Sequence, residues 1–140
     1  ALEVLDASDR PVIFSHSNPR RLHDHPRNIP DELIRACAAT GGVIGINGIG
    51  LFLGNRQPTA ADAVRHIDYV AQLVGAQHVS LGIDYMFDGD ELQDPGRASL
   101  DMWPAEWGYG SGSGILAPEA IPEIAAGLGR LGYPVAAIRG

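Results

Sequence analysis

The segment Pro11-Val-Ile-Phe-Ser-His-Ser17 decides how the chain folds. Its first four residues carry no charge, and Asn18-Pro19 interrupts the chain directly after it. A short apolar run bounded by turn residues predicts a strand buried on both faces, as in a parallel sheet. His16 then stands at the carboxyl end of this strand, where α/β sheets and barrels place their chemistry. A lone histidine there is equally compatible with a purely local hydrogen bond, so its role depends on the rest of the chain.

Two more buried strands are predicted, over Val43–Asn47 and His78–Asp84, and helical patterns alternate with them. The predicted helices run from Asp31 to the Gly41-Gly42 pair, from Thr59 to Gly75 and from Pro118 to Gly132, with shorter helical pieces at residues 1–8 and after Pro134. The strands begin near residues 11, 43 and 78, a spacing typical of βαβ units in a parallel sheet. This pattern alone leaves two folds open, part of a (β/α)₈ barrel or a smaller open α/β sheet.

Composition limits the classes of function. The chain has 140 residues, of which 45% are hydrophobic and 19% charged, so we expect one globular domain with a core. A net charge of −7 without a Lys/Arg cluster argues against a nucleic-acid partner. The single cysteine, Cys37, excludes an internal disulfide and is expected in the core. No apolar run approaches the ~20 residues that span a bilayer, so we expect no membrane segment in this chain.

Three polar residues are expected to converge on one edge of the sheet. His16, Asn47 and Asp84 end successive predicted strands, and the carboxyl ends of parallel strands share one rim. The alternative is that small polar residues only terminate these strands. Arg27, between Pro26 and Asn28, follows the first strand closely. A guanidinium fixed there suits bidentate binding of a carboxylate, although a surface salt bridge fits equally well.

Other polar clusters favour structural interpretations. His23-Asp24-His25 has the spacing of a metal site, yet in an arginine-rich loop it is expected to be solvated or locally hydrogen-bonded. His66 is expected to be a packing or surface residue, and residues 48–57 form a predicted glycine-rich loop with Leu51, Phe52 and Leu53 exposed. The long connection 85–117 is expected to be functional or mobile. Its acidic residues lack the spacing of a calcium loop and indicate solvation: Asp88, Asp90, Glu91 and Asp94.

Several of these motifs, taken together, are similar to a known family. Pro11–Ser17, then Arg27-Asn28-Ile29-Pro30-Asp31, then Gly82-Ile83-Asp84 with Phe87-Asp88-Gly89 resemble the carboxyl-terminal part of the membrane (renal) dipeptidases, the zinc dipeptidases of peptidase family M19. The resemblance implies an amidohydrolase-type (β/α)₈ TIM barrel, of which residues 1–140 would be the carboxyl-terminal portion with about strands six to eight. The chain is therefore expected to be truncated at both ends.

The resemblance also implies a function and roles for particular residues. The expected activity is hydrolysis of dipeptides by a centre of two Zn²⁺ ions. His16 matches a zinc ligand, Arg27 the arginine that binds the substrate carboxylate, and Asp84 the aspartate that binds its free amine. Asp88 rivals Asp84, because Tyr85-Met86 stretches the family's Gly-x-Asp-Phe-Asp-Gly pattern. The family's other zinc ligands, including a His-x-Asp and a bridging Glu, are expected before Ala1, and no residue of this chain is assigned as catalytic.

Alternatives to this interpretation belong to other classes. One is a binding or structural module that kept the barrel segment and lost the metal site. Another is a serine hydrolase on an open sheet, which the absence of a Gly-x-Ser-x-Gly elbow disfavours. The expected partner is a dipeptide substrate, with a homodimer left open. The expected location is cytoplasmic, although the family includes membrane-anchored and secreted members.

Overall fold

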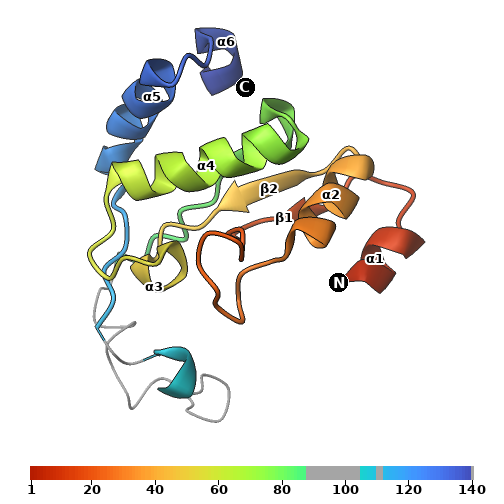
Figure 1. Cartoon of the computed structure of the whole chain (residues 1–140), viewed down its shortest axis with the longest axis horizontal. Helices are drawn as coiled ribbons and strands as arrows, with labels where there is room; N and C mark the ends of the chain where they lie inside the picture. Colours follow the sequence, from red (N-terminus) through yellow and green to blue (C-terminus); the bar gives the residue numbers. More distant parts are fainter. Residues whose placement is uncertain (88–104, 110–111, 140) are drawn as a thin grey trace.

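A parallel sheet lies at the centre of the fold (Figure 1). The computed structural model describes residues 1–87, 105–109 and 112–139. In this part of the chain the sheet has three strands, β1 (Ile13–Phe14), β2 (Val43–Ile46) and β3 (Val79–Leu81), in the order β1-β2-β3. Each strand runs parallel to its neighbour. The predicted succession of parallel βαβ units is confirmed.

Helices cover one face of this sheet. The helical elements are α1 (Leu2–Ala7), α2 (Asp31–Ala39), α3 (Gly50–Leu53), α4 (Ala60–Val74), α5 (Ile121–Arg130) and α6 (Val135–Arg139), with short turns η1 (Ala76–His78), η3 (Ala105–Trp107) and η4 (Pro118–Ala120). Helices α2 and α4 contact each other and both contact β2, so they share one side of the sheet, and α5 packs on α4 (Figure 1). No helix among the described residues has the length and apolar character to cross a bilayer.

The longest of these helices, α4, begins where the sequence predicts. Thr59 and Asp62 form a capping box, in which the Asp62 carboxylate accepts hydrogen bonds from the Thr59 amide at 2.9 Å and the Thr59 hydroxyl at 2.8 Å. Gly75, with φ +102°, follows the last residue of the helix. Because both ends are fixed locally, the apolar stripe of α4 is held in register against the sheet.

The core lies between the helices and the sheet. Ile44 and Ile46 of β2 are fully buried on the helical side, together with Cys37 as expected. His66 of α4 is also fully buried, and its Nε2–H donates to the Leu53 carbonyl at 3.2 Å. Burial lowers the pKa of His66 to about 4, so this imidazole is a neutral packing residue.

The prediction for the first strand was wrong in its extent and burial. The strand β1 has only two residues, and Ile13 is 67% exposed rather than buried on both faces. The reason is its position, because β1 is at the edge of the sheet and pairs only with β2 within the described residues. A strand reaches full burial only when both of its edges and both of its faces are covered.

The predicted exposure of Phe52 and Leu53 was also wrong. Residues 50–53 form the helix α3, and Phe52 and Leu53 are buried because this short helix packs against α4. In α5, Ile124 and Leu128 are buried, whereas Ile121 and Leu131 are 42% and 54% exposed. The contact of α5 with α4 is centred on its middle, where Gly127 meets Val64, so the two ends of the apolar stripe stay exposed.

Two glycines let the chain pack closely on the other face of the sheet. Gly45 of β2 and Gly82, which follows β3, both lie under the carbonyl group of Ser15. A Cβ at either position would overlap the Ser15 carbonyl oxygen. The absence of a side chain at both positions therefore lets the end of β1 approach the end of β3 over β2.

We predict that Gly82→Ala lowers the free energy of unfolding by about 1–3 kcal/mol, because backbone atoms must move to admit the methyl group. The matched control is Gly129→Ala in α5, where an added Cβ meets no atom within 4 Å. This control should raise stability by about 0.5–1 kcal/mol through helix propensity. Denaturant unfolding of the full-length protein measures both changes, and equal effects of the two substitutions would contradict the close approach.

Candidate functional site

The carboxyl ends of the three strands lie together, as the spacing predicts. The Asn47 side chain, directly after β2, donates from Nδ2 to Oδ2 of Asp84 at 3.2 Å. His16 follows Ser15, and its Cα lies 3.3 Å from the position that a Cβ on Gly82 would take. The structure thus gathers His16, Asn47 and Asp84 at one edge of the sheet.

A buried amide network holds this edge. The side chain of Asn18 accepts a hydrogen bond from the Asn47 backbone amide at 2.9 Å and donates to the Asn47 carbonyl at 3.3 Å. The Asn47 side chain in turn accepts from the Ile49 amide at 2.6 Å. Asn18 and Asn47 are 0% and 1% exposed, so these hydrogen bonds satisfy groups that water cannot reach.

The backbone of Asp84 has an uncommon conformation. Its φ of +59° makes it the one non-glycine residue with positive φ among the described residues. Aspartate tolerates this left-handed region better than most residues, and the Asn47 hydrogen bond holds its carboxylate in place. Asp84 itself is exposed, so the carboxylate is oriented by a buried partner while it faces solvent.

The imidazole of His16 is half-buried beside the same edge. Its Nδ1 lies 2.7 Å from the Ser15 hydroxyl, a hydrogen bond that orients the ring. A neutral imidazole with one nitrogen held by a neighbour presents the other nitrogen to a ligand, the usual arrangement of metal-binding histidines. The described residues contain no group of three or more His, Cys, Asp or Glu side chains placed to hold a metal ion. The His16 imidazole supplies at most one donor nitrogen to a metal ion, so a complete centre needs further donors.

Arg27 lies in a loop that is closed by backbone hydrogen bonds. The Arg20 amide donates to the Ile29 carbonyl at 2.8 Å, and the Ile29 amide donates to the Asn18 carbonyl at 2.9 Å. The Arg27 guanidinium carbon is 5.6 Å from the centre of the Phe52 ring, within the range of a cation–π contact. Arg27 is an exposed residue, and its ring partner Phe52 belongs to α3, a helix that begins three residues after Asn47.

The Asn28 amide connects this loop to α3. Its Nδ2 donates to the carbonyl groups of His23 and Phe52, each at 2.9 Å. Asn28 is 2% exposed, so its hydrogen bonds connect the loop to α3 inside the protein rather than at its surface.

The two histidines of the His23-Asp24-His25 motif make local packing and hydrogen-bond contacts. His25 is 5% exposed and uses both ring nitrogens in hydrogen bonds, to the Arg27 amide and the Trp107 carbonyl. Its ring stacks on that of His23, with the centroids 6.2 Å apart. Because neither nitrogen of His25 is available, this geometry favours the locally hydrogen-bonded interpretation over metal binding.

Sequence reasoning missed several residues that shape the edge. The sequence indicates only a chain break at Asn18 and an exposed loop residue at Phe52. The one available signal was that Asn18, like Asn47, is an asparagine at the polar end of a predicted strand. The proposed rival Asp88 and the acidic residues Asp90, Glu91 and Asp94 lie outside the described residues.

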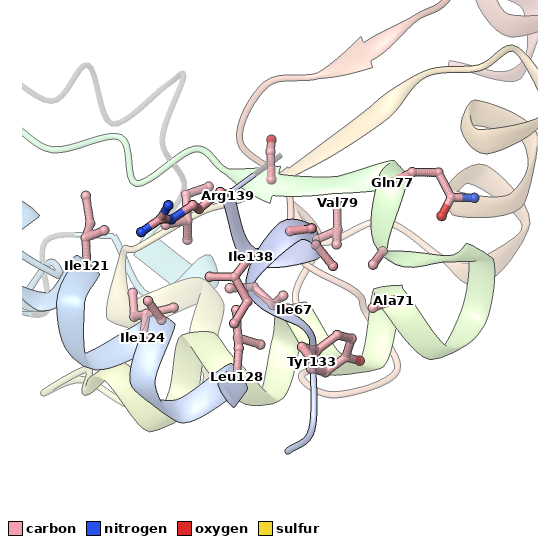
Figure 2. A pocket seen from close by; sticks show the side chains of 16 residues that line it. Ile67, Ala71, Gln77, Val79, Ile121, Ile124, Leu128, Tyr133, Ile138 and Arg139 are labelled. Atoms are coloured by element: carbon pink, nitrogen blue, oxygen red, sulfur yellow. The ribbon is translucent and has the colours of Figure 1, made fainter. Parts of the chain in front are cut away.

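An apolar groove lies elsewhere on the molecule. It has a volume of about 610 Å³ and lies between α4, α5, α6 and β3, where Ile67, Leu128 and Ile138 line it (Figure 2). None of His16, Arg27 or Asp84 borders it. The chemistry-bearing residues therefore belong to the edge of the sheet and not to this groove.

A parallel βαβ sheet with polar residues gathered at its carboxyl edge is typical of α/β sheets and barrels that carry a site at that edge, and comparison with known proteins identifies the family. Residues 1–99 match the family model for membrane dipeptidase, peptidase family M19. The chain belongs to this family.

Curated relatives are dipeptidases. An uncharacterised dipeptidase of Schizosaccharomyces pombe is 33% identical over 105 residues, which cover 73% of this chain and 25% of that protein. The dipeptidase verJ of Clonostachys rogersoniana is 37% identical over 101 residues, 72% of this chain and 26% of that protein. The chain thus spans about a quarter of the length of the curated relatives it matches.

Solved structures show the same fold. An amidohydrolase from Pseudomonas aeruginosa superposes with a TM-score of 0.73 at 26% identity, covering 98% of this chain and 44% of that one. A metallo peptidase from Rhodobacter sphaeroides, liganded with a phosphinate mimic of the dipeptide L-Ala-D-Ala, superposes with a TM-score of 0.69 at 21% identity, covering 98% and 34%. The fold is therefore part of an amidohydrolase-type TIM barrel, and the expected fold class is confirmed.

We predict that Asn47→Ala lowers the free energy of unfolding by about 1–3 kcal/mol, because the buried Ile49 amide loses its acceptor. Asn55→Ala is the matched control, since Asn55 also bonds an amide two residues on and a carboxylate, but at a more exposed position. The control should cost less than about 1 kcal/mol. Chemical denaturation of the full-length protein compares the two, and equal costs would show that burial of the network is unimportant.

Proposed function

We propose that this chain is part of a zinc-dependent dipeptidase that hydrolyses the peptide bond of dipeptides at a two-zinc centre. The observation that carries the proposal is the family match over residues 1–99, which contains His16, Arg27 and Asp84. The dipeptide mimic in the Rhodobacter sphaeroides metallo peptidase supports the substrate class. The shared edge of His16, Asn47 and Asp84 supports a site at the carboxyl ends of the strands.

In this proposal His16 is a zinc ligand. Its ring is oriented through Nδ1 by Ser15, and imidazole nitrogen is a preferred zinc donor. When zinc is bound, it polarises the scissile carbonyl as a Lewis acid. One imidazole cannot complete a centre of two metals, so the remaining ligands are proposed to come from parts of the protein outside these 140 residues.

Arg27 and Asp84 are proposed to bind the two ends of the substrate. The Arg27 guanidinium offers paired donors that match a carboxylate, and the contact with Phe52 limits its freedom. The Asp84 carboxylate, fixed by Asn47, offers an anion for the amino group of a dipeptide. Together these groups would select substrates by the presence and spacing of both charges.

We predict that His16→Ala in the full-length protein lowers zinc content and dipeptidase activity together, because it removes one ligand. His23→Ala serves as the control and should leave the zinc content unchanged. Zinc is measured by elemental analysis of the purified variants. Retention of the full zinc content in His16→Ala would exclude His16 as a ligand, and absence of zinc from the unmodified protein would favour the alternative of a barrel-derived module without catalysis.

A second prediction concerns the carboxylate and the amino group at the two ends of a dipeptide substrate. The termini of an extended dipeptide are ~7 Å apart, from the ~3.3–3.6 Å rise per residue. Arg27→Ala should cost on the order of 2–4 kcal/mol in kcat/KM on a dipeptide and much less on its carboxyl-terminal amide. Asp84→Asn should show the mirror image, with a smaller loss on an N-acetylated substrate.

The measurement is kcat/KM for each variant on each charge-blocked substrate. Arg27→Lys should restore only part of the loss, because an ammonium group cannot reproduce the bidentate geometry. Equal losses on blocked and unblocked substrates would show that Arg27 and Asp84 do not read the charges of the substrate.

A further inference from the structure

His25, two residues before Arg27, forms a hydrogen bond to it. The Arg27 backbone amide donates to Nδ1 of His25 at 3.1 Å. Since Nδ1 accepts this bond, the ring proton is on Nε2, which donates to the Trp107 carbonyl at 2.8 Å. The imidazole therefore connects the loop that carries Arg27, which we call the arginine loop, to η3. His25 and its partner Trp107 in η3 are 82 residues apart in the chain.

The same imidazole also packs on the ring beneath the guanidinium. The ring centres of His25 and Phe52 are 5.0 Å apart, and the Arg27 guanidinium carbon is 5.6 Å from the Phe52 centre. Tyr109 lies edge-on to both rings, 6.3 Å from His25 and 6.2 Å from Phe52. We call His25, Phe52 and Tyr109 the aromatic cluster. His25 therefore contacts the Arg27 backbone directly through a hydrogen bond. It also packs on Phe52, the ring that lies against the Arg27 guanidinium.

We propose that His25 is a positioning residue for substrate recognition, which holds Arg27 in the orientation that binds the carboxylate of a dipeptide. This proposal rests on the proposed function, in which Arg27 binds that carboxylate. His25 does not itself contact the substrate in this proposal, because it is buried under the loop. Its role is to fix the backbone from which the Arg27 side chain projects.

The residue type matches this role. An imidazole provides an acceptor and a donor on opposite sides of one rigid ring, and the bridge from Arg27 to Trp107 uses both. Burial lowers the pKa of His25, an effect that the hydrogen bond to Trp107 opposes without cancelling. The acceptor at Nδ1 is therefore retained at neutral pH. Asparagine preserves an acceptor near the position of Nδ1, whereas glutamine preserves a donor near the position of Nε2.

The experiment separates these two hydrogen bonds in the full-length protein. KM and kcat are measured for Ala-Ala and for Ala-Ala amide with His25→Ala, His25→Asn, His25→Gln and Arg27→Ala. His25→Ala should raise KM for Ala-Ala about tenfold, the scale of one well-placed hydrogen bond, and change KM for the amide little. His25→Asn should recover most of this loss, and His25→Gln should not.

A control histidine lies away from the arginine loop. His78 also makes a hydrogen bond to a backbone carbonyl, from Nδ1 to Gly42 at 2.8 Å. His78→Ala should affect thermal stability without changing the ratio of KM values for the two substrates. Zinc content and melting temperature, measured for every variant, identify variants that have lost the metal or the fold. If His25→Ala does not fold, the comparison of His25→Asn with His25→Gln provides the test.

Each outcome distinguishes this proposal from the one it rests on. Charge-selective loss in Arg27→Ala, together with equal losses on both substrates in His25→Ala, would make His25 a structural residue only and overturn the inference. The same conclusion follows if His25→Asn behaves like His25→Gln. If Arg27→Ala itself shows no charge selectivity, or the protein cleaves no dipeptide, the proposed function fails and this inference fails with it.

Discussion

Four residues after β1 ends, the side-chain amide of Asn18 continues the hydrogen bonding between neighbouring segments of the sheet. It bonds both the amide and the carbonyl of Asn47, as an adjacent strand residue would. Asn47 is thereby fixed at its backbone, which leaves its side chain to bond Ile49 and Asp84. Both asparagines are almost completely buried, so an unmade hydrogen bond here would be costly. The placement of Asp84 thus depends on an amide pair contributed by the ends of the two preceding strands.

Close packing and polar bonding act together at this edge. Gly45 and Gly82 let the Ser15 carbonyl lie against the sheet, which brings His16 toward the residues before Asp84. On the opposite face, Ile44 and Ile46 pack against the helices and fix the position of β2. The strand β2 therefore has one apolar face that packs against the helices and another face where Gly45 lets the Ser15 carbonyl approach closely.

Arg27 is positioned by contacts other than the Asn18–Asn47 hydrogen bonds. Its loop is closed by hydrogen bonds between residues 18–20 and Ile29, and Asn28 ties it to α3. Phe52 beneath the guanidinium and His25 beneath the backbone then restrict the direction in which the arginine projects. A charged side chain that is held before a ligand arrives loses less conformational entropy on binding. This arrangement explains why two buried aromatic residues, His25 and Phe52, lie close to the exposed Arg27.

Local sequence patterns were enough to predict the parallel βαβ order, the beginning of α4 and the polar strand ends, because these features depend on residues close together in the chain. The motif resemblance added the family. Only the tertiary structure decided burial and partners. Phe52 is buried because α3 packs on α4, and His25 bonds a carbonyl 82 residues away. Ile13 is exposed because β1 pairs only with β2 within the described part of the chain. Such contacts join residues distant in the chain, and no local pattern encodes which of them meet.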